Sequence, residues 1–407
     1  MGRFRGPAIE GGRMNGRIDR WRRAVRRARL GRGAVVAALC LLGSTPAGAW
    51  FTLSDGEKGK VDSEVRLMFW GTASGGELVP PGTPVQEERI HDFLIRRGRL
   101  IVRMQTKGRL ELYFQMGQDY AFSKIAADEA GLRIKDLYLN YRIAEAFQIT
   151  AGQFKVPFLR QNLASAFNQL LVDRSAVPAL RPAREGSRDT GAMLWGNLGT
   201  FQYRAALLDG SDQEDTNSRS ALRGTARVAW NRFERETGIG ATGTAIGAKR
   251  ILQVAAQVDL QGARHDARDE IGFTTALRDY RAWAGELFYD QPFDGGSALT
   301  VEAAWLERRD DYRDPGFATR EIAASYAQAG WLLAPEIGGG RLQLAARYEK
   351  VRSDRGGLEA RSTGRTIGVN WYAAGHDRKI QADYTRRNEE PVGIDNDEVR
   401  LSLVVVF

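Results

Sequence analysis

Three arginines in one short segment are candidates to bind an anionic ligand. Arg97, Arg99 and Arg103 share one face of a predicted strand and form a run about 20 Å long, since a strand rises ~3.3 Å per residue. Guanidinium groups attract anions and match phosphate oxygens with two parallel hydrogen bonds. The other interpretation is that these arginines pair with neighbouring acids and only brace a protein wall. The sequence leaves both interpretations open.

The remaining residue types offer little to catalysis. The three histidines, His91, His265 and His376, fall in predicted loops or turns and have no paired serine or cysteine signature. The sequence contains no P-loop, no H-E-x-x-H motif and no C-x-x-C-H haem attachment, and its only cysteine is Cys40. We therefore expect a protein that is not an enzyme and that holds no metal ion or cofactor.

The net charge of the chain is concentrated near its start. The 407 residues have a formal net charge of +9. Residues 1–49 carry 11 arginines against Glu10 and Asp19, which accounts for the whole excess, and the rest of the chain holds 48 bases and 48 acids. A nucleic-acid partner for the mature chain is therefore disfavoured.

Residues 1–49 are expected to form a signal peptide. An arginine-rich stretch precedes the apolar core Ala34–Leu42, and the small residues Ala47-Gly48-Ala49 follow as a cleavage site. This core is too short to span about 30 Å of hydrocarbon, and no later apolar segment is long enough for a membrane helix. We expect an exported mature chain of residues 50–407, with Met14 as an alternative start.

After the leader, apolar and polar residues alternate with a period of two over segments of about ten residues. In one such segment Leu110, Leu112 and Phe114 share one face while Glu111 lies on the other, because successive strand side chains point to opposite sides. The connections alternate between short turns and longer polar stretches, and residues 232–248 are longer than a short turn should be. The sixteen predicted strands lie near residues 58–71, 95–106, 109–119, 132–143, 147–154, 189–196, 200–209, 222–231, 249–260, 279–290, 298–310, 322–333, 341–352, 363–373, 379–388 and 397–407.

Short turns at one end and long loops at the other are typical of an outer-membrane β-barrel. Such a barrel closes because unpaired backbone groups cannot face lipid. A soluble β-sandwich or propeller also alternates, but it does not place aromatic residues repeatedly at the ends of apolar faces. The last strand ends its apolar face at Phe407, which resembles the closing-strand signal of bacterial outer-membrane proteins. The aromatic residues in question are Trp195, Phe201, Trp230, Trp283, Tyr289, Trp305, Trp331, Tyr348, Trp371 and Tyr384.

These patterns predict an all-β chain, a 16-stranded antiparallel transmembrane β-barrel in the bacterial outer membrane. Four segments carry a resemblance to a known family: Phe93–Leu100, Leu137–Tyr141, Gly152–Phe158 and Arg188–Gly191. Over residues 93–210 the chain resembles the phosphate-selective porin O and P family, and beyond that the likeness is only topological. The resemblance implies a 16-stranded trimeric porin whose third long loop, residues 155–188, folds into the lumen.

The residues of that loop agree with an inward position. At about 34 residues it is the longest connection, and an unstructured surface loop of this length is uncommon. Its stretch Asn162–Val172 has helix-like apolar spacing, and its bases outnumber its acids. Packed inside the barrel, the loop would narrow the pore.

Two functions remain possible from the sequence. The first is a diffusion porin for small solutes that prefers anions such as phosphate, with the loop 155–188 as its constriction. The second is a structural sleeve for a partner protein such as an electron-transfer cytochrome. We also expect contact with outer-membrane lipid and a homotrimer, the latter from the resemblance and from small residues on apolar faces: Ala205, Ala226, Ala256, Ala303 and Ala346. The predicted pore-lining and anion-binding residues are Arg97, Arg99, Arg103, Lys155, Arg160, Arg184, Arg204 and Arg227.

The leader and the alternating segments together predict a heat-modifiable barrel that begins near Trp50. Intact-mass spectrometry of the protein extracted from outer membranes should give the mass of residues 50–407. Retention of residues 14–49, or a circular dichroism spectrum dominated by helix, would contradict this expectation.

Overall fold

The computed structural model describes residues 50–75, 90–123, 131–180, 187–210, 221–266, 276–313, 317–391 and 396–407. The chain divides into two compact units, Met1–Pro46 and Ala47–Phe407, and all described residues belong to the second. The predicted signal peptide therefore lies outside the described residues.

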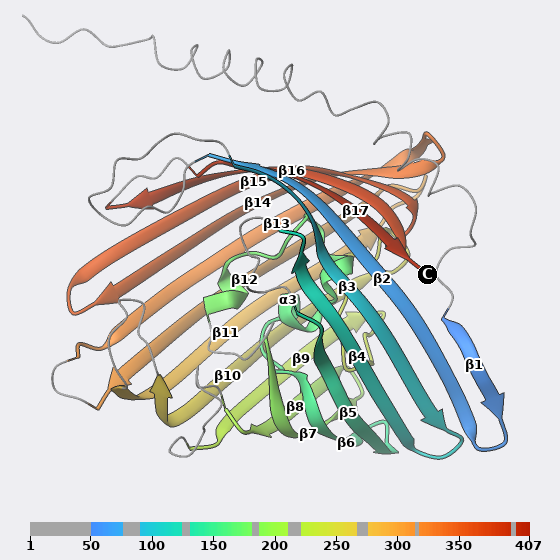
Figure 1. Ribbon diagram of the computed structural model, residues 1–407, viewed down its shortest axis with the longest axis horizontal. Helices are drawn as coiled ribbons and strands as arrows, with labels where there is room; N and C mark the ends of the chain where they lie inside the picture. Colours follow the sequence, from blue (N-terminus) through green and yellow to red (C-terminus); the bar gives the residue numbers. More distant parts are fainter. Residues whose placement is uncertain are drawn as a thin grey trace, which may run out of the picture. The chain divides into compact units, whose positions relative to one another are not determined.

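Sixteen antiparallel strands, β2 to β17, form one closed sheet in which each strand pairs with the next and β17 pairs with β2 (Figure 1). Each of the sixteen predicted strands is present, so this part of the prediction is confirmed. The strands are β2 (Gly59–Ser74), β3 (Ile90–Thr106), β4 (Leu110–Ala121), β5 (Arg133–Ala144), β6 (Phe147–Lys155), β7 (Arg188–Leu198), β8 (Phe201–Leu208), β9 (Arg223–Phe233), β10 (Ile251–Asp266), β11 (Ala276–Pro292), β12 (Ala298–Tyr312), β13 (Arg320–Ile337), β14 (Gly340–Arg355), β15 (Leu358–Ala374), β16 (Arg378–Glu390) and β17 (Glu398–Val406).

A short additional strand, β1 (Phe51–Gly56), was not predicted and completes the closure. Strand β17 covers the edge of β2 as far as Arg66, and Phe407 exchanges backbone hydrogen bonds of 3.0 and 2.9 Å with Val65. Strand β1 pairs with the remaining part of β2, from Ser63 back to Gly59. The first and last strands of the barrel domain, β1 and β17, therefore lie end to end along β2. Together they pair with the backbone groups on that edge of β2.

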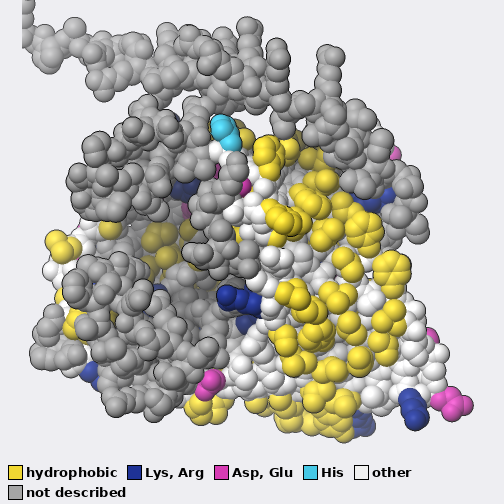
Figure 2. Space-filling model, in the orientation of Figure 1, with side chains coloured by type: hydrophobic (Ala, Val, Ile, Leu, Met, Phe, Trp, Pro, Cys, Tyr) yellow, Lys and Arg dark blue, Asp and Glu magenta, His cyan; other side chains and the backbone are white. Residues whose placement is uncertain are grey.

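The two faces of the sheet follow the alternation of the sequence. On β13, Ala323, Ala327 and Trp331 are exposed on the outside, while Tyr326 and Gln328 are buried inside. Figure 2 shows the corresponding apolar side chains gathered over β2–β5, where the exposed residues include Leu100, Met104, Leu110, Leu137 and Leu139. Within the described residues, no helix has both the length and the apolar character needed to cross a membrane.

Two details of the sequence interpretation are wrong. The stretch 353–362, between the predicted strands 341–352 and 363–373, was expected to be one of the longer polar connections. Instead β14 and β15 continue to a tight turn at Gly356 and Gly357, whose φ angles are +62° and +88°. Trp195 was expected at the outer rim but faces inward, where its indole N–H donates to Asn140 and Thr150 at 3.1 and 3.0 Å. A polar partner inside the barrel outweighs the preference of tryptophan for the lipid interface.

The long connection after β6 runs against the inner wall of the barrel. Its described residues, 156–180 and 187, contain α3 (Arg160–Leu163) and the 3-10 turns η2 (Ala166–Asn168) and η3 (Val177–Leu180), so the helix-like spacing of Asn162–Val172 corresponds to no continuous helix. Its apolar side chains share one core with small inward residues of β11 to β13. That core includes Val156, Phe158, Leu159 and Val177 from the connection and Ala282, Ala284, Ala304 and Ala324 from the wall.

Two wall glycines make room for this connection. A Cβ atom on Gly330 of β13 would lie 2.5 Å from the Leu170 side chain, and one on Gly368 of β15 would lie 2.7 Å from the Leu171 side chain. Real Cβ atoms do not approach other carbons so closely. The absence of side chains at these two positions therefore lets both leucines pack against the wall.

Gly152 on β6 is a position where the barrel wall itself requires glycine. Its φ angle is +126°, and a Cβ atom there would lie 2.3 Å from the carbonyl oxygen of Leu137. We expect Gly152→Ala to destabilise the barrel by about 1–3 kcal/mol, because alanine is strained in this conformation. The temperature at which the folded band disappears from a heat-modifiability gel should fall. Gly224→Ala on β9 is the control, because its Cβ meets nothing within 4 Å. Equal unfolding temperatures for the two variants would show that Gly152 has no such role.

Candidate functional site

A β-bulge in β3 brings four arginines to the inner face of this strand. The register between β2 and β3 shifts between Met68 and Phe69, so the residue opposite this shift, Arg96, has no partner on β2. As a result Arg96 and Arg97 are adjacent in sequence and both buried inside, with 7% and 8% exposure. Arg96 lies over the ring of Tyr120, with 3.8 Å between its guanidinium carbon and the ring centroid.

Sequence alternation missed Arg96 because a strict period of two assigns it to the lipid face. The inward position of Arg96 could have been inferred from the residue types of the outer row alone. An arginine in an outer row otherwise formed by Gly98, Leu100, Val102 and Met104 is unfavourable next to lipid, and an inserted residue removes it from that row.

One carboxylate, that of Asp119 on β4, is shared by four cations. Arg99 Nη2 lies 2.5 Å and Lys135 Nζ 2.9 Å from its oxygens. Arg96 and Arg97 approach to 3.8 and 3.9 Å. The side chain of Asp119 keeps 21% exposure, so solvent reaches this cluster. We call these five residues the Asp119 cluster.

The connection after β6 places a second acid, Asp173, and another arginine, Arg174, next to this cluster. Asp173 lies 3.6 Å from Arg97 and is 27% exposed. Burial would raise the pKa of the Asp173 carboxyl, but Arg97 and Arg96 outweigh this effect and hold the pKa well below its usual range. The next residue, Arg174, donates to the carbonyl oxygens of Gln161 and Ala164, and burial together with Arg97 lowers its pKa to about 9.

Lys155 and Arg103 lie apart from the Asp119 cluster. Lys155, the last residue of β6, donates to the carbonyl oxygens of Leu163 and Ala164 at 3.3 and 2.9 Å. Arg103 lies farther along β3, 3.5 Å from Asp62 and 4.5 Å from the ring of Trp50. Lys155 therefore holds the connection in place, and Arg103 holds the start of the domain.

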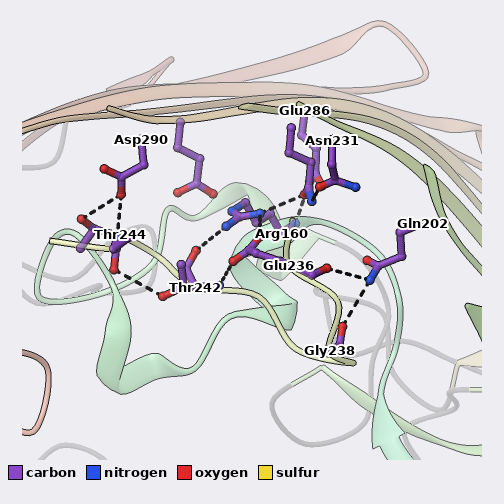
Figure 3. Close-up of polar contacts among 12 residues, drawn as sticks. Arg160, Gln202, Asn231, Glu236, Gly238, Thr242, Thr244, Glu286 and Asp290 are labelled. Carbon is purple, nitrogen blue, oxygen red and sulfur yellow. Dashed lines mark hydrogen bonds and ion pairs between the residues drawn. The ribbon is translucent and has the colours of Figure 1, made fainter. Parts of the chain in front are cut away.

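Arg160 on α3 is the centre of a second, more deeply buried cluster (Figure 3). Its side chain is 1% exposed, lies 2.5 Å from Glu236 and stacks on Phe288 at 3.6 Å. It also donates to Gln253 Oε1 and to the carbonyl oxygen of Thr242, both at 2.9 Å. Burial disfavours the charged form, but Glu236 outweighs it, so the pKa of Arg160 lies above its ordinary value.

Two predicted wall arginines complete this second cluster. Arg227 pairs with Glu286, and its guanidinium group also reaches Gln253 Oε1 at 2.8 Å. Arg204 donates to the carbonyl oxygen of Gly238 at 3.0 Å, and its buried Nε and Nη1 atoms have no hydrogen-bond partner among the described residues. We call Arg160, Arg204 and Arg227, with Glu236 and Glu286, the Arg160 cluster.

The segment between β9 and β10, residues 234–250, supplies Glu236, Gly238 and Thr242 to the Arg160 cluster. It lies at the end of the barrel with the shorter connections, and its length is the only feature of the sequence that sets it apart. Ala241 forms a backbone bridge to Ala164, so this segment meets the connection after β6 inside the barrel. Farther along, the N–H of Ala245 donates to Asp290 at 2.6 Å, which fixes the segment to β11. Figure 3 shows the neighbouring Thr244 beside Asp290.

The structure thus brings together some predicted site residues and separates others. Arg97 and Arg99 share one acid, and Arg160, Arg204 and Arg227 belong to a second cluster, whereas Lys155 and Arg103 lie outside both clusters. Arg184 lies outside the described residues. In the part of the chain that is described, no three His, Cys, Asp or Glu side chains are grouped to hold a metal ion.

Three comparisons place this architecture among known proteins. A family model described as phosphate-selective porin O and P matches residues 81–406. An uncharacterised protein of Aquifex aeolicus (strain VF5) is 24% identical over 319 residues, which cover 72% of this chain and 74% of that protein.

Solved structures support the fold. The anion-selective porin from Comamonas acidovorans has a TM-score of 0.54 and 11% identity over 86% of this chain and 100% of that one. The trimer form of OmpT, an outer-membrane protein of Vibrio cholerae, has a TM-score of 0.52 and 11% identity over 86% and 100%. At these identities the likeness concerns the fold alone.

The contact between the two inward segments should depend on Arg160. We expect Arg160→Met to leave Glu236 buried without its partner and to loosen the backbone bridge between Ala241 and Ala164, because breaking a buried ion pair costs about 3–5 kcal/mol. Hydrogen exchange should become faster by at least about ten-fold at the amide of Ala241, which donates to Leu163. Arg309→Gln, which removes an exposed ion pair, is the control. Unchanged exchange in Arg160→Met would mean that the two segments hold each other without this arginine.

Proposed function

The chain belongs to the phosphate-selective porin O and P family, and from this premise we propose that this outer-membrane porin channel passes small solutes with a preference for anions such as phosphate. The observation that carries the preference is the Asp119 cluster, in which four cations share one carboxylate. Asp119 and the nearby Asp173 are two acids against these four bases, so an excess of positive charge remains beside two partly exposed carboxylates. Fixed positive charge next to low-dielectric walls raises the local concentration of anions.

The path of the solute is proposed to run along β2 to β4 rather than through the Arg160 cluster. Asp119 and Asp173 retain 21% and 27% side-chain exposure, whereas Glu236 and Glu286 retain 12% and 2%. The four cations of the Asp119 cluster retain 6–9%, whereas Arg160 and Arg227 retain 1% and 2%. In this proposal the loop 155–188 is the constriction, because hydrogen bonds join its backbone to distant strands of the barrel. The N–H of Arg160 donates to Glu286 on β11 at 2.6 Å, and the N–H of Val172 donates to Asp383 on β16 at 3.1 Å.

The cations of the interior divide into two roles in this proposal. Those of the Asp119 cluster attract the solute. Lys155, Arg160, Arg204 and Arg227 hold the two inward segments and keep the constriction in place, through the carbonyl oxygens and carboxylates that they contact. The wall-bracing interpretation of the arginines thus applies to one cluster and the anion-binding interpretation to the other.

The sleeve alternative is less well supported. A sleeve needs free space for a partner inside the barrel, but segments of this chain occupy the interior. Phe158, Leu159, Leu170 and Leu171 are each buried to at least 99% there. A cytochrome would have to displace them.

A homotrimer is part of the proposal. Its support is the set of small side chains on the outer face, of which Ala205 on β8 and Ala256 on β10 are exposed and lie away from β14. Such side chains permit flat contact between barrels. One of the structures similar in fold is itself described as a trimer form. The mass of the protein in gentle detergent tests this part.

The anion preference is tested by the zero-current potential of planar bilayers under a potassium chloride gradient. Arg97→Gln combined with Arg99→Gln should lower the ratio of chloride to potassium permeability by roughly two-fold or more, because two fixed charges leave the accessible cluster. Asp119→Asn should raise that ratio, because it removes the acid that partly offsets the same cations.

Arg309→Gln is the control for this experiment, because its guanidinium group lies on the outside of the barrel and is 45% exposed. It should leave the ratio unchanged. A wild-type channel without anion preference, or opposite charge changes that shift the ratio in the same direction, would refute the preference and leave a general diffusion channel.

A further inference from the structure

Three basic side chains form a group on the outer surface of β14 to β16. Lys350, Arg365 and Arg386 are all exposed and share the lipid-facing parity of their strands. Arg365 and Arg386 stand directly opposite each other on neighbouring strands, and Lys350 is opposite Thr363, two residues from Arg365. Directly opposed side chains lie about 5 Å apart at Cβ, where like charges repel. We call these three residues the outer basic group.

The other exposed bases on this side of the barrel differ, because they have acidic partners. Arg281 and Arg309 pair with Asp311, and Arg352 and Arg361 pair with Glu359. The outer basic group has no ion pair within the described part of the chain. Asp397, beside β16, instead accepts a hydrogen bond of 2.5 Å from the hydroxyl of Tyr384. Three mutually repelling bases therefore receive no counter-charge from the described residues.

A shallow groove of about 420 Å³ lies directly beside this group, on the outside of β11 to β14. Small residues form its floor and large apolar residues flank it. Ser325 in the groove is opposite Lys350, and Tyr348 in the groove is opposite Arg365. The residues that line its outer side include Leu287, Ala303, Trp305, Ser325, Ala327 and Tyr348.

The depth of the outer basic group in the membrane follows from the strand. On β14 the outward row is apolar from Leu342 to Tyr348 and becomes basic at Lys350, toward the end with the long loops. Aromatic residues such as Tyr348 and Tyr384 mark the interface between hydrocarbon and headgroups. The outer basic group therefore lies at the level of lipid headgroups in the extracellular leaflet, and the groove lies below it in the hydrocarbon.

We propose that this surface binds a phosphate-bearing lipid of the outer membrane, with phosphate on Lys350, Arg365 and Arg386 and an acyl chain in the groove. The phosphate supplies the missing counter-charge, because guanidinium groups bind phosphate oxygens with charge-assisted hydrogen bonds. The acyl chain fills an apolar depression that a flat lipid boundary would leave unevenly packed. This site is on the outside of the barrel and does not depend on the anion preference of the pore.

The test uses the whole protein in detergent with two probes, bisphosphorylated lipid A and the same lipid after removal of its phosphates, detected by native mass spectrometry. The wild type should bind the phosphorylated lipid more tightly than the dephosphorylated one. Replacement of Lys350, Arg365 and Arg386 by glutamine should weaken binding of the phosphorylated lipid by roughly ten-fold or more and remove the difference between the probes. Arg309→Gln is the matched control, an exposed base with its own acidic partners, and should bind as the wild type does.

A second variant, Ala327→Trp, separates the two halves of the site. It fills the groove and should weaken binding of the acylated lipid while the outer basic group remains intact. A heat-modifiability gel verifies that each variant has folded, and only folded variants are compared. Equal binding by the wild type and the triple variant overturns the proposal, as does equal binding of both probes to the wild type. Disulfide cross-linking between copies through Arg365→Cys also overturns it, because the surface would then be an interface between copies of this chain.

Discussion

Backbone hydrogen bonding at membrane depth is the constraint on which the rest of this structure depends. Lipid offers no partner to an N–H or a carbonyl group, so each strand must pair on both sides. Sixteen strands achieve this by closing, and β1 covers the part of the β2 edge that β17 does not reach. Closure gives every strand an outer and an inner row. The outer row meets lipid and is apolar. The inner row is free to carry charge, which is why a chain with balanced charge can concentrate its arginines in one interior.

The charged side chains inside the barrel form two kinds of cluster. In our proposal one supports the structure and the other acts on the solute. Arg160 and Arg227 are almost fully buried. Arg160 pairs with Glu236 and so joins two inward segments from different connections, and Arg227 pairs with Glu286 on the barrel wall. Such a pair adds little net stability relative to apolar packing, but its loss leaves a buried charge. The Asp119 cluster is different, because it is accessible and its cations outnumber its acids. The first arrangement is a rigid support. The second creates a positive potential at a place that water can reach.

The sequence predicted the sixteen strands because a period of two is imposed on each strand by the two environments, lipid and lumen. It also predicted the inner row, since Arg97, Arg99, Arg204 and Arg227 all face inside. What it could not predict are events that break the period or depend on tertiary contacts. The bulge at Arg96 inserts one residue without changing composition. Trp195 turns inward for two polar partners on β5 and β6. The segment 234–250 was conspicuous only by its length, and its contact with α3 joins residues about eighty positions apart.

The central claim is that solutes pass beside the Asp119 cluster and not through the Arg160 cluster. The most direct measurement is the reaction of a small, charged, membrane-impermeant thiol reagent with single cysteines, monitored as single-channel current. Cys40 is the only cysteine of the chain and precedes the barrel, so an introduced cysteine is unique there. The account predicts that the reagent changes the current through Asp119→Cys within the recording and leaves the current through Glu236→Cys unchanged. Modification of Glu236→Cys with no effect at Asp119→Cys would contradict it and would place the path of the solute at the junction of the two inward segments.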